Sequence, residues 1–231
     1  MSYGLEVQNS TGDLVIDAAF RNFEIIAEGT GTHVGSGLLA YVDITFPATA
    51  QPPLVFVRST GYGLGCATLL RDGSGNYTTA RLYSEALFNT FSFDWFVAAP
   101  ADGLSGEAWG LQVFDASAKK VFDSGERYVQ FREVASVSVA TAFETAAGLN
   151  VEGYLPVAHA AVSTAYYCLS SLRAFISNII FEYPATFFPT VRAYNTTTAW
   201  VAVTDRAIVG SWTPDPYTRN PGYLVVATKS A

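Results

Sequence analysis

The chain carries one short pattern twice, at its start and near its middle. Residues 3–21 read YGLEVQNSTGDLVIDAAFR, and residues 109–127 read WGLQVFDASAKKVFDSGER. In each copy apolar and polar residues alternate, a polar turn follows, and a second apolar run returns, which is the pattern of a β-hairpin. A duplicated hairpin favours two related β modules, or one sandwich built by internal duplication.

The positions that the two copies share define a structural repeat. A Gly before the strand permits a bend, and an Asp is followed four residues later by an Arg, so that the two are placed to brace the hairpin exit as an ion pair. We expect this pair to be structural. The second copy has Ala118 and Lys119 where a turn Gly is usual. The charged and Gly positions of the repeat are Gly4, Asp17 and Arg21 in the first copy and Gly110, Asp123 and Arg127 in the second.

Most of the remaining chain also predicts β-strands. Short β-branched or aromatic runs such as PPLVFVRST, FSFDWFVAAP and TAWVAVTD are separated by Gly-, Pro- and Asp-rich turns. The predicted fold class is therefore all-β, with two β-sandwich-like modules at 1–105 and 106–231, each carrying one hairpin. The alternative is one continuous β domain. Residues 165–182 fit a helical stripe, but their β-branched and aromatic content favours strand.

Composition and charge exclude several functions. Half of the 231 residues are hydrophobic and 14% are charged, which excludes a disordered chain. A net charge of −7 argues against binding to nucleic acid phosphates or to an anionic membrane. The sixteen Phe residues exceed what a small core usually takes, so some are expected at interfaces.

One apolar segment and two cysteines need separate treatment. The segment from His159 to Phe181 holds Arg173 near its middle, which favours a buried core segment over a membrane span. Cys66 and Cys168 lack metal-type spacing, and two isolated buried thiols are favoured over a disulfide. The chain opens directly on a strand-like stretch, so we expect no signal peptide.

The hairpin motifs and the PPLVFVRSTG run resemble tail proteins of double-stranded DNA bacteriophages. The likeness covers about a third of the chain, and its motifs are structural. It implies a virion protein of the tail tip, the baseplate or a fibre attachment, made in the host cytoplasm and located in the tail. The expected partners are other tail proteins and further copies of the chain in a homo-oligomer.

The search for catalytic chemistry returns little. His33 and His159 have no partner at metal-ligand spacing, and the sequence has neither H-E-x-x-H nor G-x-S-x-G. GYGLGC lacks the Lys of a phosphate loop. Carboxylates such as Glu85, Asp94 and Asp205 leave a glycosidase as the third-ranked reading. We therefore expect no enzyme, no cofactor and no metal.

A proline-rich aromatic loop at residues 210–223, GSWTPDPYTRNPGY, is the candidate binding site. Prolines lower the entropy cost of presenting aromatic rings, and such rings stack on sugars. The candidate residues are Trp212, Tyr217, Arg219 and Tyr223. Packing at the end of the sandwich or at an interface is the stronger interpretation of this loop. The main prediction is thus a structural tail protein, and the alternative is a receptor- or carbohydrate-binding module of the tail that recognises the host surface.

Overall fold

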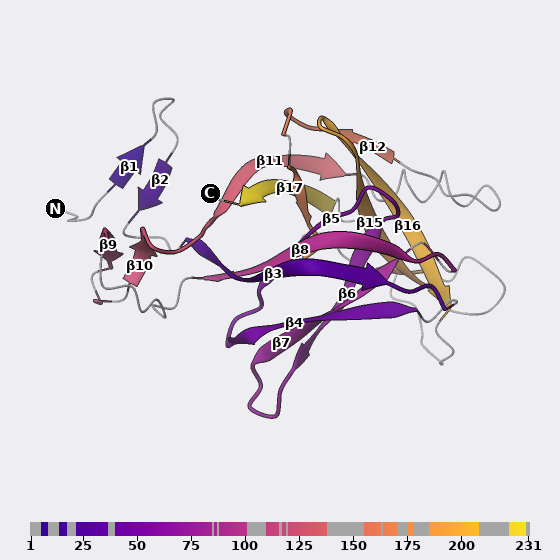
Figure 1. Cartoon of the computed structure of the whole chain (residues 1–231), viewed down its shortest axis with the longest axis horizontal. Helices are drawn as coiled ribbons and strands as arrows, with labels where there is room; N and C mark the ends of the chain where they lie inside the picture. Colours follow the sequence, from indigo (N-terminus) through magenta and orange to yellow (C-terminus); the bar gives the residue numbers. More distant parts are fainter. Residues whose placement is uncertain are drawn as a thin grey trace.

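Figure 1 shows the computed structural model, in which every element of the described residues is a β-strand. Two large antiparallel sheets pack face to face, and two small hairpins lie at one end of the long axis (Figure 1). The predicted all-β class with sandwich-like modules and a duplicated hairpin is confirmed. The structure describes residues 6–8, 14–17, 22–36, 40–84, 86, 88–100, 110–115, 117–118, 120–137, 155–162, 164–170, 175–177, 185–207 and 222–229.

Both predicted hairpins form, and they share one register. The first pairs β1 (Glu6–Gln8) with β2 (Leu14–Asp17), and the second pairs β9 (Gln112–Phe114) with β10 (Lys120–Asp123). Each paired residue of the first hairpin matches the residue 106 positions later, and the register shifts at the same place in both. The paired residues are Glu6–Asp17, Val7–Ile16 and Gln8–Leu14, against Gln112–Asp123, Val113–Phe122 and Phe114–Lys120.

The two large sheets contain the other strands. The six-stranded sheet has the order β11-β17-β13-β5-β8-β3, and the other sheet has the order β12-β16-β15-β6-β7-β4, with β14 paired to β15 beside this path. The first comprises β3 (Phe23–His33), β5 (Leu54–Arg58), β8 (Phe91–Pro100), β11 (Val129–Val137), β13 (Tyr166–Cys168) and β17 (Gly222–Lys229). The second comprises β4 (Tyr41–Thr49), β6 (Leu64–Arg71), β7 (Tyr77–Ser84), β12 (Leu155–Ala158), β14 (Phe175–Ser177), β15 (Ala185–Asn195) and β16 (Thr198–Ala207).

In each large sheet, the strands from the second half of the chain lie in the mirrored order of the equivalent strands from the first half. Strands β3 to β8 correspond, in chain order, to β11, β12, β13, β15, β16 and β17. Each half of the chain therefore contributes three neighbouring strands to each sheet, and the pairs β5–β13 and β6–β15 join the halves. The predicted boundary at residue 105 falls between these two repeat units. The sheets nevertheless run on across it, so the sandwich-like modules form one continuous two-sheet unit.

The register of the strands confirms that the two repeat units have the same backbone arrangement. In the first unit β3 pairs with β8 from Phe23 onward, with a bulge between Ile25 and Ala27. In the second unit β11 pairs with β17 from Val129 onward, with a bulge between Phe131 and Glu133. These positions also differ by 106. A bulge is a specific feature of one position in a strand, so its repetition identifies equivalent strands.

A local twofold axis relates the two units at the centre of the six-stranded sheet. Phe56 lies two residues after the partner of Ala98, and Cys168 lies two residues after the partner of Ala227. Since Ala98 and Ala227 are equivalent, Phe56 and Cys168 are equivalent too. They lie directly opposite each other where β5 meets β13. The axis therefore passes between them.

The outer edges of the same sheet meet at one end. Glu24 of β3 forms an antiparallel bridge with Tyr128, just before β11, and the Ile25 amide donates to the Arg127 carbonyl at 2.7 Å. This register sets Phe23 opposite Val129, which are again equivalent residues. The six-stranded sheet thus closes on itself around the local axis.

The described residues form two apolar cores. The first lies between the sheets and includes Val55 and Val57. The second lies on the opposite face of the six-stranded sheet, where the Phe56 and Phe96 rings stack with centroids 4.5 Å apart and Phe131 of β11 contacts Phe56 at 6.3 Å. Strand β5 is therefore buried on both faces, which explains its unbroken apolar run.

The segment from residue 159 to residue 181 contributes buried strand, as predicted. Its described parts include β13, which is buried, and β14. Residues 171–174 and 178–184 lie outside the described residues. None of the described residues belongs to a helix long and apolar enough to cross a membrane. Cys66 and Cys168 are both free thiols, as the sequence favoured; Cys168 is buried as expected, whereas Cys66 is partly exposed.

Candidate functional site

The second hairpin is anchored to the body through Asp123, whose side chain is buried. Its carboxylate accepts hydrogen bonds from Gln112 Nε2 at 2.8 Å and from the Gly125 amide at 2.9 Å. The Asp123 amide donates to the Tyr128 hydroxyl at 2.6 Å, and burial raises the pKa of Tyr128 to about 12. Asp123 of the repeat therefore has a structural role, because it fixes the hairpin to the start of β11.

Arg127 forms an ion pair with Glu28 of the six-stranded sheet, whereas the sequence predicted an ion pair with Asp123. Its guanidinium lies 2.7 Å from Glu28 Oε1, and Lys229 Nζ donates to Glu28 Oε2 at 2.9 Å. Hydrogen bonds from Arg127 and then Lys229 lower the pKa of Glu28. Because Glu28 belongs to β3 and Lys229 to β17, the triad holds the closed end of the six-stranded sheet together.

Gly110 opens the hairpin with a φ of +134°, which L side chains rarely adopt. A Cβ at this position would overlap Ser124 Oγ. That oxygen accepts a hydrogen bond from the Leu111 amide at 2.8 Å, and the Ser124 amide donates to the Leu111 carbonyl at 2.9 Å. The shared Gly of the repeat thus lets the two ends of the hairpin approach closely.

The hairpin turn is set by Asp115 and Ala118. The Asp115 side-chain oxygen Oδ1 accepts a hydrogen bond from the Ser117 amide at 2.8 Å. The backbone carbonyl of Asp115 accepts one from the Ala118 amide at 3.0 Å. Ala118 takes a φ of 59°, the left-handed region. The residue 106 positions earlier in the sequence is Gly12, a residue type that takes a positive φ more readily than alanine.

Apolar side chains of this hairpin face solvent. Leu111 and Phe114 are each 50% exposed. On the strand that follows, Phe131 and Val134 are also exposed. Exposed apolar side chains that gather on one element are a feature of protein–protein contact sites.

A second candidate surface covers the outer face of the seven-stranded sheet. Arg81 of β7 binds Asp43 of β4 through two hydrogen bonds of 2.8 and 2.7 Å, and its Cζ lies 3.8 Å from the Tyr41 ring centroid. The Tyr41 ring, 46% exposed, also contacts Tyr83 edge-on at 6.0 Å. This bidentate pair holds the Tyr41 ring in a defined position.

A similar cluster occupies the second unit. Tyr194, 58% exposed, stacks on Trp200 with centroids 4.2 Å apart. Arg192 Cζ lies 4.6 Å from the Trp200 ring centroid, and its Nη1 donates to the Gly61 carbonyl at 2.6 Å. Tyr83 and Trp200 belong to the equivalent strands β7 and β16, so the two clusters lie on opposite sides of the local axis. Neither cluster was predicted from the sequence, although alternate Arg and aromatic residues in ARLY and VRAY were a signal for them.

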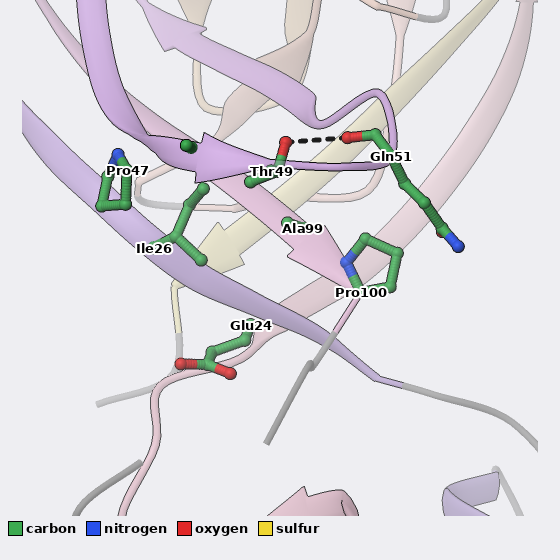
Figure 2. A pocket seen from close by; sticks show the side chains of 8 residues that line it. Glu24, Ile26, Pro47, Thr49, Gln51, Ala99 and Pro100 are labelled. Atoms are coloured by element: carbon green, nitrogen blue, oxygen red, sulfur yellow. Dashed lines mark hydrogen bonds between the residues drawn. The ribbon is translucent and has the colours of Figure 1, made fainter. Parts of the chain in front are cut away.

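Figure 2 shows a small hollow at the ends of β3, β4 and β8. Its volume is about 60 Å³, enough for a few water molecules. Thr49 on its rim donates to the Gln51 carbonyl at 2.8 Å, and Glu24 is the one ionisable side chain among the described residues that line it. This hollow is too small to enclose a substrate. Its lining residues are Glu24, Ile26, Pro47, Ala48, Thr49, Gln51, Ala99 and Pro100.

Several predicted residues lie outside the described part of the chain. They are Gly4, Arg21, Trp212, Tyr217 and Arg219. Asp17 ends β2, and Tyr223 lies in β17. The aromatic loop therefore stays a prediction.

Both histidines pack inside the body. His33 is buried against the Phe91 ring, with centroids 5.2 Å apart. His159 is also buried, with Nε2 3.1 Å from the Tyr167 hydroxyl, whose pKa burial raises to about 12. The described residues include no group of three or more His, Cys, Asp or Glu that could hold a metal.

The carboxylates considered for a glycosidase are not assembled into a described site. Asp94 accepts a hydrogen bond from Thr30 at 3.0 Å and lies 3.7 Å from Arg58. Asp205 lies in β16, and Glu85 is outside the described residues. Asp94 therefore links neighbouring strands of the six-stranded sheet.

No family model, curated protein or solved structure matches this chain.

Proposed function

We propose that the chain is a structural virion protein of a bacteriophage tail, in the tail tip, the baseplate or a fibre attachment, and that it acts through protein–protein interfaces. One observation carries this proposal: a duplicated hairpin lies at one end of a closed two-sheet body, and its second copy exposes Leu111 and Phe114 (Figure 1). Apolar residues held outside the core are suited to contact with another subunit.

The body supports this role because its cores are complete without those side chains. The six-stranded sheet is closed by the Glu24–Tyr128 bridge and the Glu28 ion pairs, and neither Leu111 nor Phe114 belongs to its cores. The low charged fraction of 14% suits large subunit interfaces, whose centres are depleted of charge. We propose a phage tail as the assembly because the hairpin motifs resemble those of tail proteins.

Immunogold electron microscopy tests the proposal on particles released from the source of the chain. An antibody against the chain is expected to label one end of a tail. Unlabelled particles, with the protein free in the lysate, would contradict a virion role. Phe114→Asp is expected to lower incorporation into particles, whereas Val34→Asp, at an exposed apolar residue beyond the other end of β3, is the matched control.

A carbohydrate-binding module remains the second candidate function, favoured by the two aromatic clusters on the seven-stranded sheet. Tyr41 and Tyr194 each have a ring held by a neighbour, so little conformational entropy is lost when a ligand stacks on them. Arg81 and Asp43 supply donors and acceptors beside the rings. Rings next to polar groups match a sugar, which has apolar faces and hydroxyl edges.

Titration with purified surface polysaccharide of the host tests this second function. Saturable binding that Tyr194→Ala or Tyr41→Ala weakens would support the sheet face, with Phe88→Ala as the exposed aromatic control. Loss of binding in Trp212→Ala alone would place the site on the 210–223 loop. Absence of binding by the unaltered chain would reject the carbohydrate function.

A further inference from the structure

Strand β11 forms one edge of the six-stranded sheet. It pairs with β17 on one side, and its other side meets β3 only at the bridge between Glu24 and Tyr128. Beyond Tyr128 the described residues give β11 no second strand partner, and Figure 1 shows it as the uppermost strand of this sheet. A free strand edge has backbone donors and acceptors that a strand of another chain can satisfy.

Two apolar side chains beside this free edge face solvent. Phe131 is 49% exposed and Val134 is 61% exposed. Their partners in β17 are Ala227 and Val225, which both pack in the second core, so Phe131 and Val134 lie on the same face of the sheet. The free edge of β11 therefore combines unpaired backbone with exposed apolar surface.

The equivalent edge of the first unit lacks this combination. In β3 the position of Phe131 is taken by Ile25, which is 8% exposed, and the position of Val134 is taken by Glu28, which is held in ion pairs. Because the backbone arrangement is the same in both units, the fold alone does not require exposed apolar residues on β11. Contact with a partner accounts for them.

The edge strands of the seven-stranded sheet are less suited to pairing with another chain. Strand β4 contains Pro47, and its outer face holds Asp43. Strand β12 has four residues, and one of them is Pro156. Proline and charged side chains are features that keep edge strands from pairing with other molecules. Among the described edges, β11 is therefore the best candidate.

The residues of this edge are complementary to themselves. Residues 131–134 read Phe-Arg-Glu-Val. If two copies of β11 run antiparallel about a twofold axis between positions 132 and 133, Phe131 of each copy lies opposite Val134 of the other. Arg132 of each copy then lies opposite Glu133 of the other. Apolar pairs and pairs of opposite charge both stabilise neighbouring antiparallel strands.

The faces of these side chains agree with the same register. Glu133 is opposite Val226 of the first core, and Arg132 donates from Nε to Thr228 Oγ1 at 3.1 Å. Val226 and Thr228 alternate with the residues of the second core along β17, so Arg132 and Glu133 share the face opposite to Phe131. The bulge at Arg132 thus gives the stretch a symmetric order of faces, and each opposed pair meets on one face.

Both charged side chains keep the capacity for a second contact. Arg132 Nη2 also donates to Gln130 at 2.7 Å, but a guanidinium has five N–H donors. Glu133 Oε2 accepts from the Ala160 amide at 2.6 Å, and a carboxylate has a second oxygen. These hydrogen bonds hold the two groups in place beside the edge, so less side-chain freedom is lost when they pair with another copy.

We propose that two copies of the chain form a symmetric dimer by antiparallel pairing of their β11 edges, with Phe131 opposite Val134 and Arg132 opposite Glu133. A contact of this kind uses the same surface of both copies, so it closes at two subunits. The inference goes beyond the proposed tail function and does not depend on it.

Charge reversal tests the partner and the register together. Analytical ultracentrifugation of the unaltered chain is expected to show a dimer at about 0.15 M salt, which screens the repulsion between chains of net charge −7 beyond about 8 Å. Arg132→Glu and Glu133→Arg each set like charges opposite each other at both pairs, so each should weaken the dimer about tenfold or more. An equimolar mixture of the two variants should restore it, because every pair then has opposite charges.

Two results of this experiment would overturn the inference. One is an unaltered chain that stays monomeric at every concentration measured, and the other is a mixture that dimerises no better than its components. Thermal unfolding of each variant separates loss of the dimer from loss of the fold. Restored pairing in the mixture requires both variants to be folded.

The apolar pair is tested by Val134→Asp, which should also weaken the dimer about tenfold or more. Val34→Asp is the matched control, since Val34 is likewise 61% exposed and lies outside β11. Equal dimerisation of these two variants would contradict the proposed interface. Immunogold labelling decides the tail location separately, whichever oligomer forms.

Discussion

Phe56 of β5 and Cys168 of β13 lie directly opposite each other, and they are the same position of two repeat units. The neighbouring pairs keep this relation, because Leu169 donates its amide to the Val55 carbonyl at 2.8 Å and Tyr167 lies opposite Val57. An equivalent pair on a twofold axis means that each unit completes the other at this junction. The two repeat units are therefore joined as the subunits of a symmetric dimer would be.

Truncation of Phe56 should destabilise the whole body. Its ring is fully buried and stacks on Phe96 at 4.5 Å, so Phe56→Ala leaves a cavity at the junction. Such changes cost about 3–5 kcal/mol of unfolding free energy. Urea denaturation measures the loss, and Phe88→Ala, at an exposed Phe, should change stability by about 0.5 kcal/mol or less. Equal effects of the two changes would contradict the assignment of Phe56 to a core.

Two glycines of β3 leave room for aromatic rings of β8. A Cβ at Gly31 would overlap the Phe93 ring, and one at Gly29 would lie 3.1 Å from Trp95 Cζ2. Gly31→Ala should therefore cost about 1–3 kcal/mol, more than Gly29→Ala. Gly73→Ala is the control, since no atom lies within 4 Å of its added Cβ. If all three variants unfold at the same urea concentration, the rings do not cover the glycines.

The sequence predicted what local patterns determine. Alternation at Leu111 and Val113, followed by a polar turn, identified the second hairpin because strand and turn lie within a few residues of each other. The order of strands in the sheets could not be predicted from the sequence, since β13 has three residues and its pairing with β5 joins positions more than 100 residues apart. Nothing near Cys168 in the sequence indicates that Phe56 is its neighbour.

Side-chain partners were predicted where they are near in sequence and missed where they are distant. Arg127 was assigned to Asp123 because that carboxylate is four residues away, whereas its partner is Glu28 on another strand. Arg192 and Trp200 meet only because β15 pairs with β16 in one register. Long-range pairing therefore decides the candidate surfaces, and one sequence does not reveal it.

Removal of the Glu28 charge should weaken the closed end of the six-stranded sheet in a pH-dependent way. The pKa of Glu28 lies below its ordinary value in the folded state, so its stabilisation is present above the unfolded pKa and is lost as pH falls through the folded pKa. Glu28→Gln should cost about 1 kcal/mol or less at pH 7, and nothing once Glu28 is protonated. Denaturation at several pH values tests this, with Glu126→Gln as the charge-matched control. A pH-independent difference would contradict the ion-pair explanation.

The two thiols should resist modification in the folded protein. Cys168 is buried. The pKa of Cys66 is raised to about 12, mainly by burial of its thiol and to a lesser extent by the nearby Cys168. The reactive thiolate of Cys66 is then a fraction of about one in ten thousand at pH 8. Ellman's reagent is expected to find no fast-reacting thiol in the native chain and two after unfolding in guanidinium. A rapid native reaction of either residue would show that its surroundings open readily.

Ala118→Gly should stabilise the second hairpin. Ala118 holds a φ of 59°, where a Cβ costs about 1–2 kcal/mol, and the first hairpin has Gly12 at the equivalent position. Glycine loses more backbone entropy on folding, by about 0.5–1 kcal/mol, so the net gain should be roughly 0.5–1 kcal/mol. Thermal unfolding measures it against Ser117→Gly, which brings the same entropy cost at a neighbouring turn residue. A lower melting temperature for Ala118→Gly would mean that the turn does not take this conformation in solution.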